Sequence, residues 1–246
     1  MTASITPKCL SMWSGPRNIS TAMMRAFGNR ADCHPVDEPF YAYYLTKTGL
    51  QHPMREEVIA SQPNDWKEAA AQFSQPLTDG QSLLYLKHMT QHILPEIDKA
   101  SLQDHTHCFL IRHPRLVIAS FAEKWSDVTA EATGFKQQLI LYKYFKEQGA
   151  SVCVIEGEDI QKSPRTMLDL LCKSCDIPFD ENMLSWPTGR HPEDGVWGKH
   201  WYNAVEKSSG FAPYIEKEVS LSPALERLAE ELEPFYDELK QQKIRH

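Results

Sequence analysis

The fold is decided by residues 9–27, which read CLSMWSGPRNISTAMMRAF. Their first part is an apolar run that predicts a buried strand, and Ser20–Phe27 has the pattern of a helix. A short turn joins the two, so the first N–H groups of the helix and the positive end of its dipole face this turn. Arg17 adds a full positive charge, and Ser20 and Thr21 add hydroxyl donors. The turn therefore predicts a phosphate site; an ordinary capped helix after a β-turn is the alternative.

Short apolar runs alternate with longer amphipathic runs along the rest of the chain, which is typical of a parallel sheet covered on both faces. The predicted strands are Cys9–Trp13, Cys33–Asp37, Ser82–Met89, His107–Arg112 and Val152–Glu156. The predicted helices are Ser20–Phe27, Pro39–Thr46, Asp65–Phe73, Pro114–Trp125, Glu131–Gln148 and Pro164–Cys175, and a last one spans Leu225–Leu239, with a kink or restart at Pro234. We find no repeat, long linker or composition break, so we predict a single three-layer α/β/α domain over residues 1–246 with a central parallel sheet.

Composition and charge limit the classes of partner. Apolar residues are 41% of the 246 residues, and 26 basic against 33 acidic residues give a net charge of −7, so a nucleic-acid surface is not expected. The chain has no apolar run near the ~18 residues of a membrane span, and residues 1–8 lack the order of a signal peptide. We therefore expect a cytoplasmic protein without a membrane partner. Residues 1–31 contain four basic residues and no acid, which favours an anionic ligand near this end.

The six cysteines do not predict a metal site. Most lie in apolar runs, as expected of reduced thiols in a core. Cys172 and Cys175 have the spacing of a zinc or redox pair, but they close a helical pattern and have no second pair to complete a site. We expect no metal.

A second basic position follows the fourth predicted strand. Arg112 ends that strand, and Ser120 lies about two turns into the helix that starts at Pro114. Ligands of an open parallel sheet collect outside the carboxyl ends of its strands, so Arg112 should reach the same edge as the first turn. A solvent-facing arginine and an ordinary helix serine are the alternatives.

These two segments together resemble the PAPS-dependent sulfotransferases (PAPS is 3′-phosphoadenosine 5′-phosphosulfate). The run Arg17-Asn18-Ile19-Ser20-Thr21 resembles the loop that holds the 5′-phosphosulfate, although Ile19 stands where a glycine is common. Arg112 with Ser120 resembles the 3′-phosphate site. The resemblance implies a P-loop NTPase-like fold, PAPS as co-substrate and a small-molecule acceptor.

Three further segments carry the same resemblance. Leu86-Lys87-His88-Met89 lies on the predicted third strand, where the family often has its catalytic base. Asp37-Glu38-Pro39-Phe40 resembles bacterial members that have an acidic residue near the acceptor, and residues 197–201 resemble the late segment that covers PAPS. The surrounding residues, Thr188–Ser209, predict a loop or lid.

The chemistry of sulfuryl transfer assigns roles to these residues. The acceptor must lose a proton to a base, and positive charge must stabilise the leaving phosphate oxygen. Arg17 and the helix N-terminus would supply the charge, and the lower charge of the transferred group makes a metal unnecessary. We expect His88 to be the base because an imidazole titrates near neutral pH, with Glu38 as its rival. A structural strand histidine and an exposed carboxylate are the alternatives.

Two other functions fit the same fold. A P-loop kinase would need a Walker A motif, which the chain lacks, although Asp37 could hold its metal. A non-catalytic nucleotide-binding protein would bind the nucleotide without turnover. The sequence leaves the acceptor, the adenosine contacts and the oligomeric state open.

Overall fold

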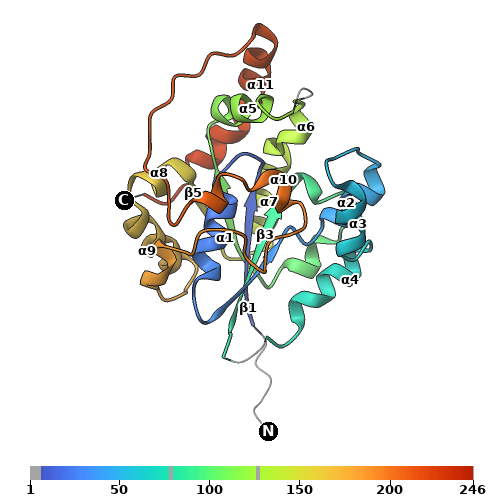
Figure 1. Ribbon diagram of the computed structural model, residues 1–246, viewed down its shortest axis with the longest axis vertical. Coiled ribbons are helices and arrows are strands. Elements are labelled where there is room, and N and C mark those ends of the chain that lie inside the picture. Colours follow the sequence, from blue (N-terminus) through green and yellow to red (C-terminus); the bar gives the residue numbers. More distant parts are fainter. Residues whose placement is uncertain (1–6, 78–79, 126–127, 246) are drawn as a thin grey trace.

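The sheet sits at the centre of the molecule and its strands are parallel. The structure is a computed structural model that describes residues 7–77, 80–125 and 128–245. The strands are the arrows at the centre of Figure 1. In the described residues five strands pair in the order β2-β3-β1-β4-β5. Their bounds are β1 (Lys8–Ser14), β2 (Cys33–Asp37), β3 (Leu83–Met89), β4 (Thr106–Ile111) and β5 (Val152–Glu156). The prediction of a central parallel sheet is confirmed.

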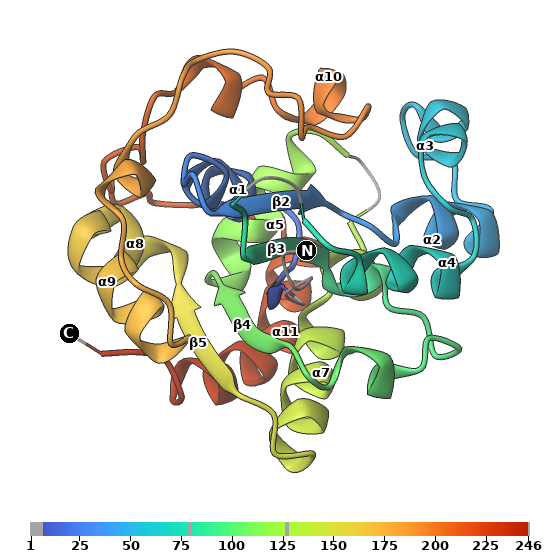
Figure 2. The ribbon, with the colours of Figure 1, turned by 90° about the horizontal axis from the view of Figure 1, so that it is seen from below.

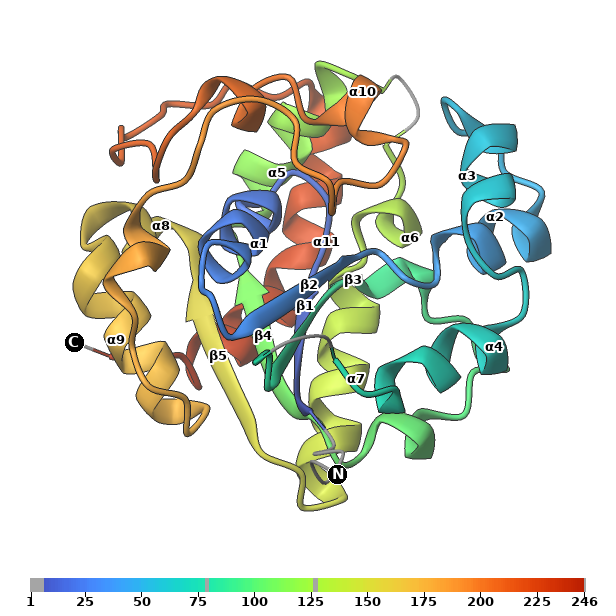
Figure 3. The same cartoon turned by 60° about the horizontal axis from the view of Figure 1, so that its bottom comes forward.

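Helices cover both faces of this sheet. Their bounds are α1 (Ser20–Gly28), α2 (Tyr41–Thr48), α3 (Arg55–Ser61), α4 (Trp66–Ala71), α5 (Pro114–Ala122), α6 (Ala130–Thr133), α7 (Phe135–Glu147), α8 (Gly157–Lys162), α9 (Pro164–Ser174), α10 (Gly198–Trp201) and α11 (Pro223–Lys240). Helices α1, α8 and α9 pack on one face, and α7 and α11 pack on the other (Figures 2 and 3). This arrangement is the predicted α/β/α fold.

Some predicted helices have different bounds. The predicted helix Glu131–Gln148 is two helices, because Gly134 has a φ of 74° and ends α6 before α7 begins. The last helix, by contrast, continues through Pro234 as one element. The short helices α3 and α8 were not expected, and neither has the length to give a clear amphipathic pattern.

The strand order explains how distant parts of the chain meet. Strand β1 pairs with β3 on one side and with β4 on the other, so its neighbours in the sheet are not its neighbours in the sequence. The connections that follow β1 and β4 both begin at the edge of the sheet where the strands have their carboxyl ends. Open α/β sheets bind ligands at this edge, between neighbouring strands whose connections run in opposite directions. Among the described residues, no helix is long and apolar enough to cross a membrane.

Candidate active site

The first turn follows β1 and is fixed by close packing. A Cβ atom on Gly15 would lie 2.4 Å from the carbonyl oxygen of Thr133, so only glycine fits there. Arg17 has a φ of 58°, in the left-handed region that is rare for a residue with a side chain. Helix α1 then begins at Ser20, and no side chain caps it. Its first N–H groups are thus available to a bound anion.

The second predicted phosphate segment meets this turn. The Nε atom of Arg17 donates to Oγ of Ser120 at 3.0 Å, and Nη1 of Arg112 donates to the carbonyl oxygen of Arg17. Burial lowers the pKa of both guanidinium groups, although the charge of Glu123 acts in the opposite direction on Arg17 and that of Glu158 does so on Arg112. Within the described residues, neither arginine has a carboxylate within ion-pair distance. Two adjacent, half-buried cations without a paired anion favour a negatively charged ligand.

A buried cluster of charges lies at the carboxyl ends of β2 and β3. The ammonium of Lys87 donates to Oδ1 of Asp37 at 2.9 Å, to Oε1 of Glu38, and to Oη of Tyr202 at 2.9 Å, which uses every N–H that a lysine has. Tyr202 in turn donates to Asp37. The two carboxylates raise the pKa of Lys87, although burial alone would lower it. Lys87 therefore stays charged and holds both carboxylates in place.

Of the two carboxylates in this cluster, Glu38 is the one that lines a cavity. Burial raises its pKa to about 7, even though Lys87 acts in the opposite direction. Its φ of 42° is again in the left-handed region, and its backbone N–H is held by the carbonyl oxygen of Lys87 at 2.9 Å. A carboxylate with this pKa can take up a proton at neutral pH.

His92 lies beside Glu38 and was not singled out from the sequence. Its Nδ1 atom is 3.9 Å from Oε2 of Glu38 and has no hydrogen-bond partner among the described residues. Burial lowers the pKa of His92, and the charges of His52 and Lys87 lower it further. The imidazole is therefore neutral at working pH.

His88 lies on the other side of the sheet from this cluster. Its ring stacks on Trp13 with ring centroids 4.1 Å apart and on Phe40 at 5.7 Å, and neither ring nitrogen has a partner among the described residues. Burial, together with other nearby histidines, lowers its pKa. His88 is separated from the Glu38–Lys87 cluster because successive residues of a strand point to opposite faces, and Lys87 takes the face of the cluster.

A main cavity of about 560 Å³ joins these groups. The predicted site residues that line it are Arg17, Asn18, Ile19, Ser20, Thr21, Glu38, Arg112 and Ser120. His88 is absent from this lining, whereas Lys87, His92 and Tyr202 belong to it. The structure therefore brings the two predicted phosphate segments and one of the two predicted bases into a single space.

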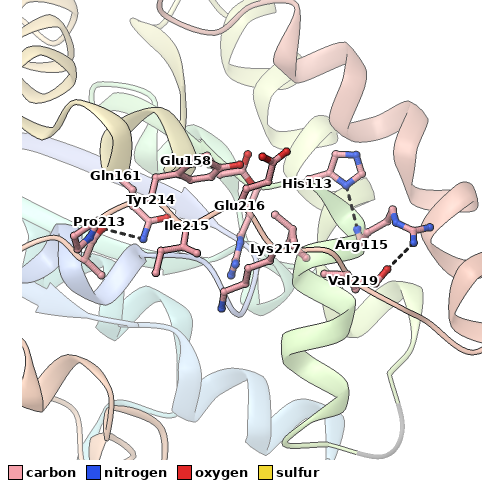
Figure 4. A pocket seen from close by; sticks show the side chains of 13 residues that line it. His113, Arg115, Glu158, Gln161, Pro213, Tyr214, Ile215, Glu216, Lys217 and Val219 are labelled. Carbon is pink, nitrogen blue, oxygen red and sulfur yellow. Dashed lines mark hydrogen bonds between the residues drawn. The ribbon is translucent and has the colours of Figure 1, made fainter.

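Figure 4 shows the lining of a side cavity of about 400 Å³. Arg112 and Gln161 line both cavities. The outer wall of the side cavity is the extended segment 212–219, which contributes Tyr214 and Lys217 and is tied to α5 by a bond from Arg115 to the carbonyl oxygen of Val219 at 2.9 Å. Arg112 thus stands at the junction of the two spaces.

The segment predicted as a loop or lid covers the main cavity and is firmly attached. It contains α10, and Trp197, Trp201 and Tyr202 line the cavity beneath it. Asp194 forms a buried ion pair with Arg25 of α1 at 2.6 Å, and the backbone N–H of Gly195 donates to Asp37 at 3.0 Å. These long-range bonds fix the cover to α1 and to the charged cluster.

Comparison with known proteins assigns a family to this fold and site. A family model described as a sulfotransferase domain matches residues 8–243. A crystal structure of a sulfotransferase from Alicyclobacillus acidocaldarius has a TM-score of 0.57 over 96% of both chains; at 11% identity it shows a shared fold.

Two curated relatives come from Arabidopsis thaliana, the branched-chain-amino-acid aminotransferase-like proteins 1 and 2. They are 32% and 30% identical over 84% and 81% of this chain, which spans only 37% and 35% of their length. The family model, by contrast, matches almost the whole chain. By its sequence from residue 8 to 243, its P-loop NTPase-like α/β fold and the cavity at its sheet edge, this chain belongs to the sulfotransferase domain family.

Proposed function

We propose that the protein transfers a sulfuryl group from PAPS to a hydroxyl or amine of a small-molecule acceptor. One observation carries the proposal: Arg17 and Arg112 contact each other in the same cavity as the Glu38–Lys87 pair. Among the described residues, neither arginine forms an ion pair with a carboxylate. The arginines suit the donor's phosphates, and the carboxylate suits a proton from the acceptor. Both halves of the reaction thus have the groups they need.

The donor would lie along the first turn. Arg17, Asn18, Ile19, Ser20 and Thr21, at the uncapped start of α1, would hold the 5′-phosphosulfate. The charge of Arg17 would stabilise the leaving phosphate oxygen as the bond to sulfur breaks. No metal is needed for this step in the proposal.

The 3′-phosphate would bind between Arg112 and Ser120. The Ser120 hydroxyl accepts from Arg17, so its own proton is free to point at a ligand. The adenosine would extend into the side cavity, where Tyr214 offers a ring and Lys217 a charge. In this arrangement Arg112 contacts the phosphate at the junction of the cavities.

Glu38 would act as the base. It lines the main cavity, its pKa is raised by burial, and Lys87 and Asp37 fix its position. Glu38 therefore replaces His88 in the proposed mechanism, and His92 forms the adjoining wall rather than taking the proton.

A cytoplasmic location is also part of the proposal. Four of the six cysteines, Cys33, Cys108, Cys172 and Cys175, are buried in the apolar core. Cysteines that serve as small core residues are typical of proteins from a reducing compartment.

The function is tested by incubating the protein with PAPS and a panel of alcohols, phenols and amines in the presence of a chelator. We expect release of PAP and one or more sulfated products by mass spectrometry. Binding of ATP with Mg²⁺ and none of PAP would overturn the proposal in favour of a kinase.

A further inference from the structure

The segment that follows α11 returns to the sheet beside the proposed donor site. Lys243 forms a parallel bridge with Val154 of β5, and the backbone N–H of Ile244 donates to the carbonyl oxygen of Val154 at 2.8 Å. Strand β5 is the last strand in the sheet order, so this segment lies along an outer edge of the sheet. The end of the chain is thereby attached to the strand that leads into α8.

The side chain of Lys243 binds both sides of the start of α8. Its ammonium donates to Oε2 of Glu156, the last residue of β5, and to Oδ2 of Asp159 at 2.5 Å. Tyr236 of α11 donates to the other carboxylate oxygen of Glu156, which is only 4% exposed. Hydrogen bonds between ionised groups are stronger than those between neutral groups, so Lys243 holds this part of α8 in a fixed position.

The start of α8 contacts both parts of the proposed donor site. A Cβ atom on Gly157 would lie 2.7 Å from Oδ1 of Asn18, so α8 packs directly on the turn that follows β1. Glu158 and Gln161 line the side cavity together with Arg112 (Figure 4). Lys243 itself lines neither the main cavity nor the side cavity, so it can affect a bound donor only through α8 and its charge.

The start of α8 carries an excess of negative charge. Glu156, Glu158 and Asp159 lie within four residues, and the single ammonium of Lys243 offsets one of their three charges. Burial raises the pKa of Glu158, and the charge of Glu156 raises it further, so the charge of Glu156 is felt in the side cavity. A phosphate bound at Arg112 would experience the same repulsion, which would increase without Lys243.

We propose that Lys243 is a positioning residue of the donor site, which holds the start of α8 against the turn after β1 and offsets the acidic charge beside the 3′-phosphate. This inference rests on the proposed function. Lys243 does not touch the reacting atoms, so its contribution is to the affinity for the donor.

The test is a calorimetric titration of the full chain with PAP and with adenosine 5′-phosphate, which lacks the 3′-phosphate. Lys243→Met should weaken PAP binding about 3–10-fold at about 0.05 M salt and change adenosine 5′-phosphate binding less than about twofold, because only the 3′-phosphate lies beside α8. The loss for PAP should shrink at about 0.5 M salt. Equal losses for both nucleotides, or a loss that salt does not change, would overturn the inference.

Two variants serve as controls for Lys243→Met. Lys143 pairs with Glu238 of α11 at 2.8 Å, away from α8, so Lys143→Met should leave PAP binding unchanged. Lys243→Arg should stay within about twofold of the parent protein, because a guanidinium can also donate to two carboxylates. A loss in Lys143→Met as large as that in Lys243→Met, or no rescue by arginine, would count against the assigned role.

Asp159→Asn tests the charge separately from the fold. Combined with Lys243→Met it returns the net charge of this turn to that of the parent protein, and most of the lost PAP affinity should be recovered. Alone it removes one acidic charge while Lys243 still binds Glu156, so PAP should bind about 2–4-fold more tightly. This single variant decides the matter if Lys243→Met does not fold, and an unchanged or weaker PAP affinity in it would overturn the inference.

PAP binding by the parent protein separates this inference from the proposed function. Tight PAP binding that is the same in the parent protein and in Lys243→Met would leave the sulfotransferase function intact and remove the role of Lys243. Failure of the parent protein to bind PAP would overturn the proposed donor, and the role of Lys243 with it.

Discussion

Glu38→Gln should abolish most of the turnover and also change its dependence on pH. Glutamine keeps the size of the side chain and can still contact Lys87, which retains Asp37 as its counter-charge, so the fold should survive. Loss of a general base costs about 10²–10⁴-fold in kcat. We expect a loss in this range, with PAP affinity within a few-fold of the parent protein.

The expected pH profile follows from the pKa of Glu38. Burial raises this pKa to about 7, and only the ionised form can take the acceptor proton. The ionised fraction is then roughly a tenth at about pH 6 and roughly nine-tenths at about pH 8, so activity should rise about tenfold across this window. The pKa of His92 is lowered and that of Lys87 is raised, so neither titrates there.

The assay is the initial rate of PAP release between about pH 5.5 and 8.5 at saturating PAPS, with Glu131→Gln as the matched control. Glu131 is also a carboxylate of the main cavity, but it is exposed and lies outside the Lys87 cluster. Its variant should keep both the rate and the rising limb. Near-normal turnover in Glu38→Gln, or a rising limb that persists in it, would refute the assignment of Glu38 as the base.

Four further predictions concern the donor site, the charged cluster and the strand histidine. PAP without metal should stabilise the protein by about 2.7 kcal/mol at a hundred times its Kd, which is a melting shift of roughly 5–10 °C in a thermal-shift assay; a shift with ATP and Mg²⁺ alone would contradict the donor assignment. Arg112→Ala should weaken PAP binding by about 1.5–3 kcal/mol in calorimetry and leave a nucleotide without the 3′-phosphate almost unaffected, whereas equal losses would move Arg112 out of that phosphate site. Lys87→Met should lower the free energy of unfolding in urea by about 3–5 kcal/mol, because Asp37 and Glu38 would be buried without a cation, and an unchanged denaturation midpoint would argue against the cluster. His88→Phe should retain turnover within a few-fold, because its ring nitrogens have no partners among the described residues and its neighbours are aromatic; a loss of a hundredfold or more would return His88 to the mechanism.

The sequence predicts the donor side of the site better than the acceptor side. The segment Arg17–Thr21 and Arg112 each follow a strand directly, and a parallel sheet brings such positions to one edge. The base depends instead on which face of β3 each side chain takes. Lys87 and His88 are adjacent, so a shift of one residue in register exchanges them, and the hydrophobic pattern of a fully buried strand does not reveal the register.

The sequence predicts a loop or lid at Thr188–Ser209, but local sequence patterns do not predict how this segment is attached. Its attachment depends on Asp194 reaching Arg25 and on Tyr202 reaching Asp37, and both pairs are more than a hundred and sixty residues apart in the chain. A segment rich in glycine, histidine and tryptophan has no periodicity that would predict such contacts. His92 was missed for a similar reason, because it lies in a short turn after β3 and becomes part of the site only through the packing of α2.

Asp37 connects the proposed base, Glu38, to the segment that covers the cavity, because it is hydrogen-bonded both to Lys87 and to residues of that segment. Asp37 accepts from Lys87 on one side and from Tyr202 and the backbone of Gly195 on the other. If the segment around α10 swings outward to admit the donor or release the product, Lys87 loses Tyr202 and the cluster is opened to water. The environment that raises the pKa of Glu38 would then disappear, so an open molecule would hold PAPS beside a weak base. Such an interlock would protect the donor from hydrolysis until the acceptor is enclosed.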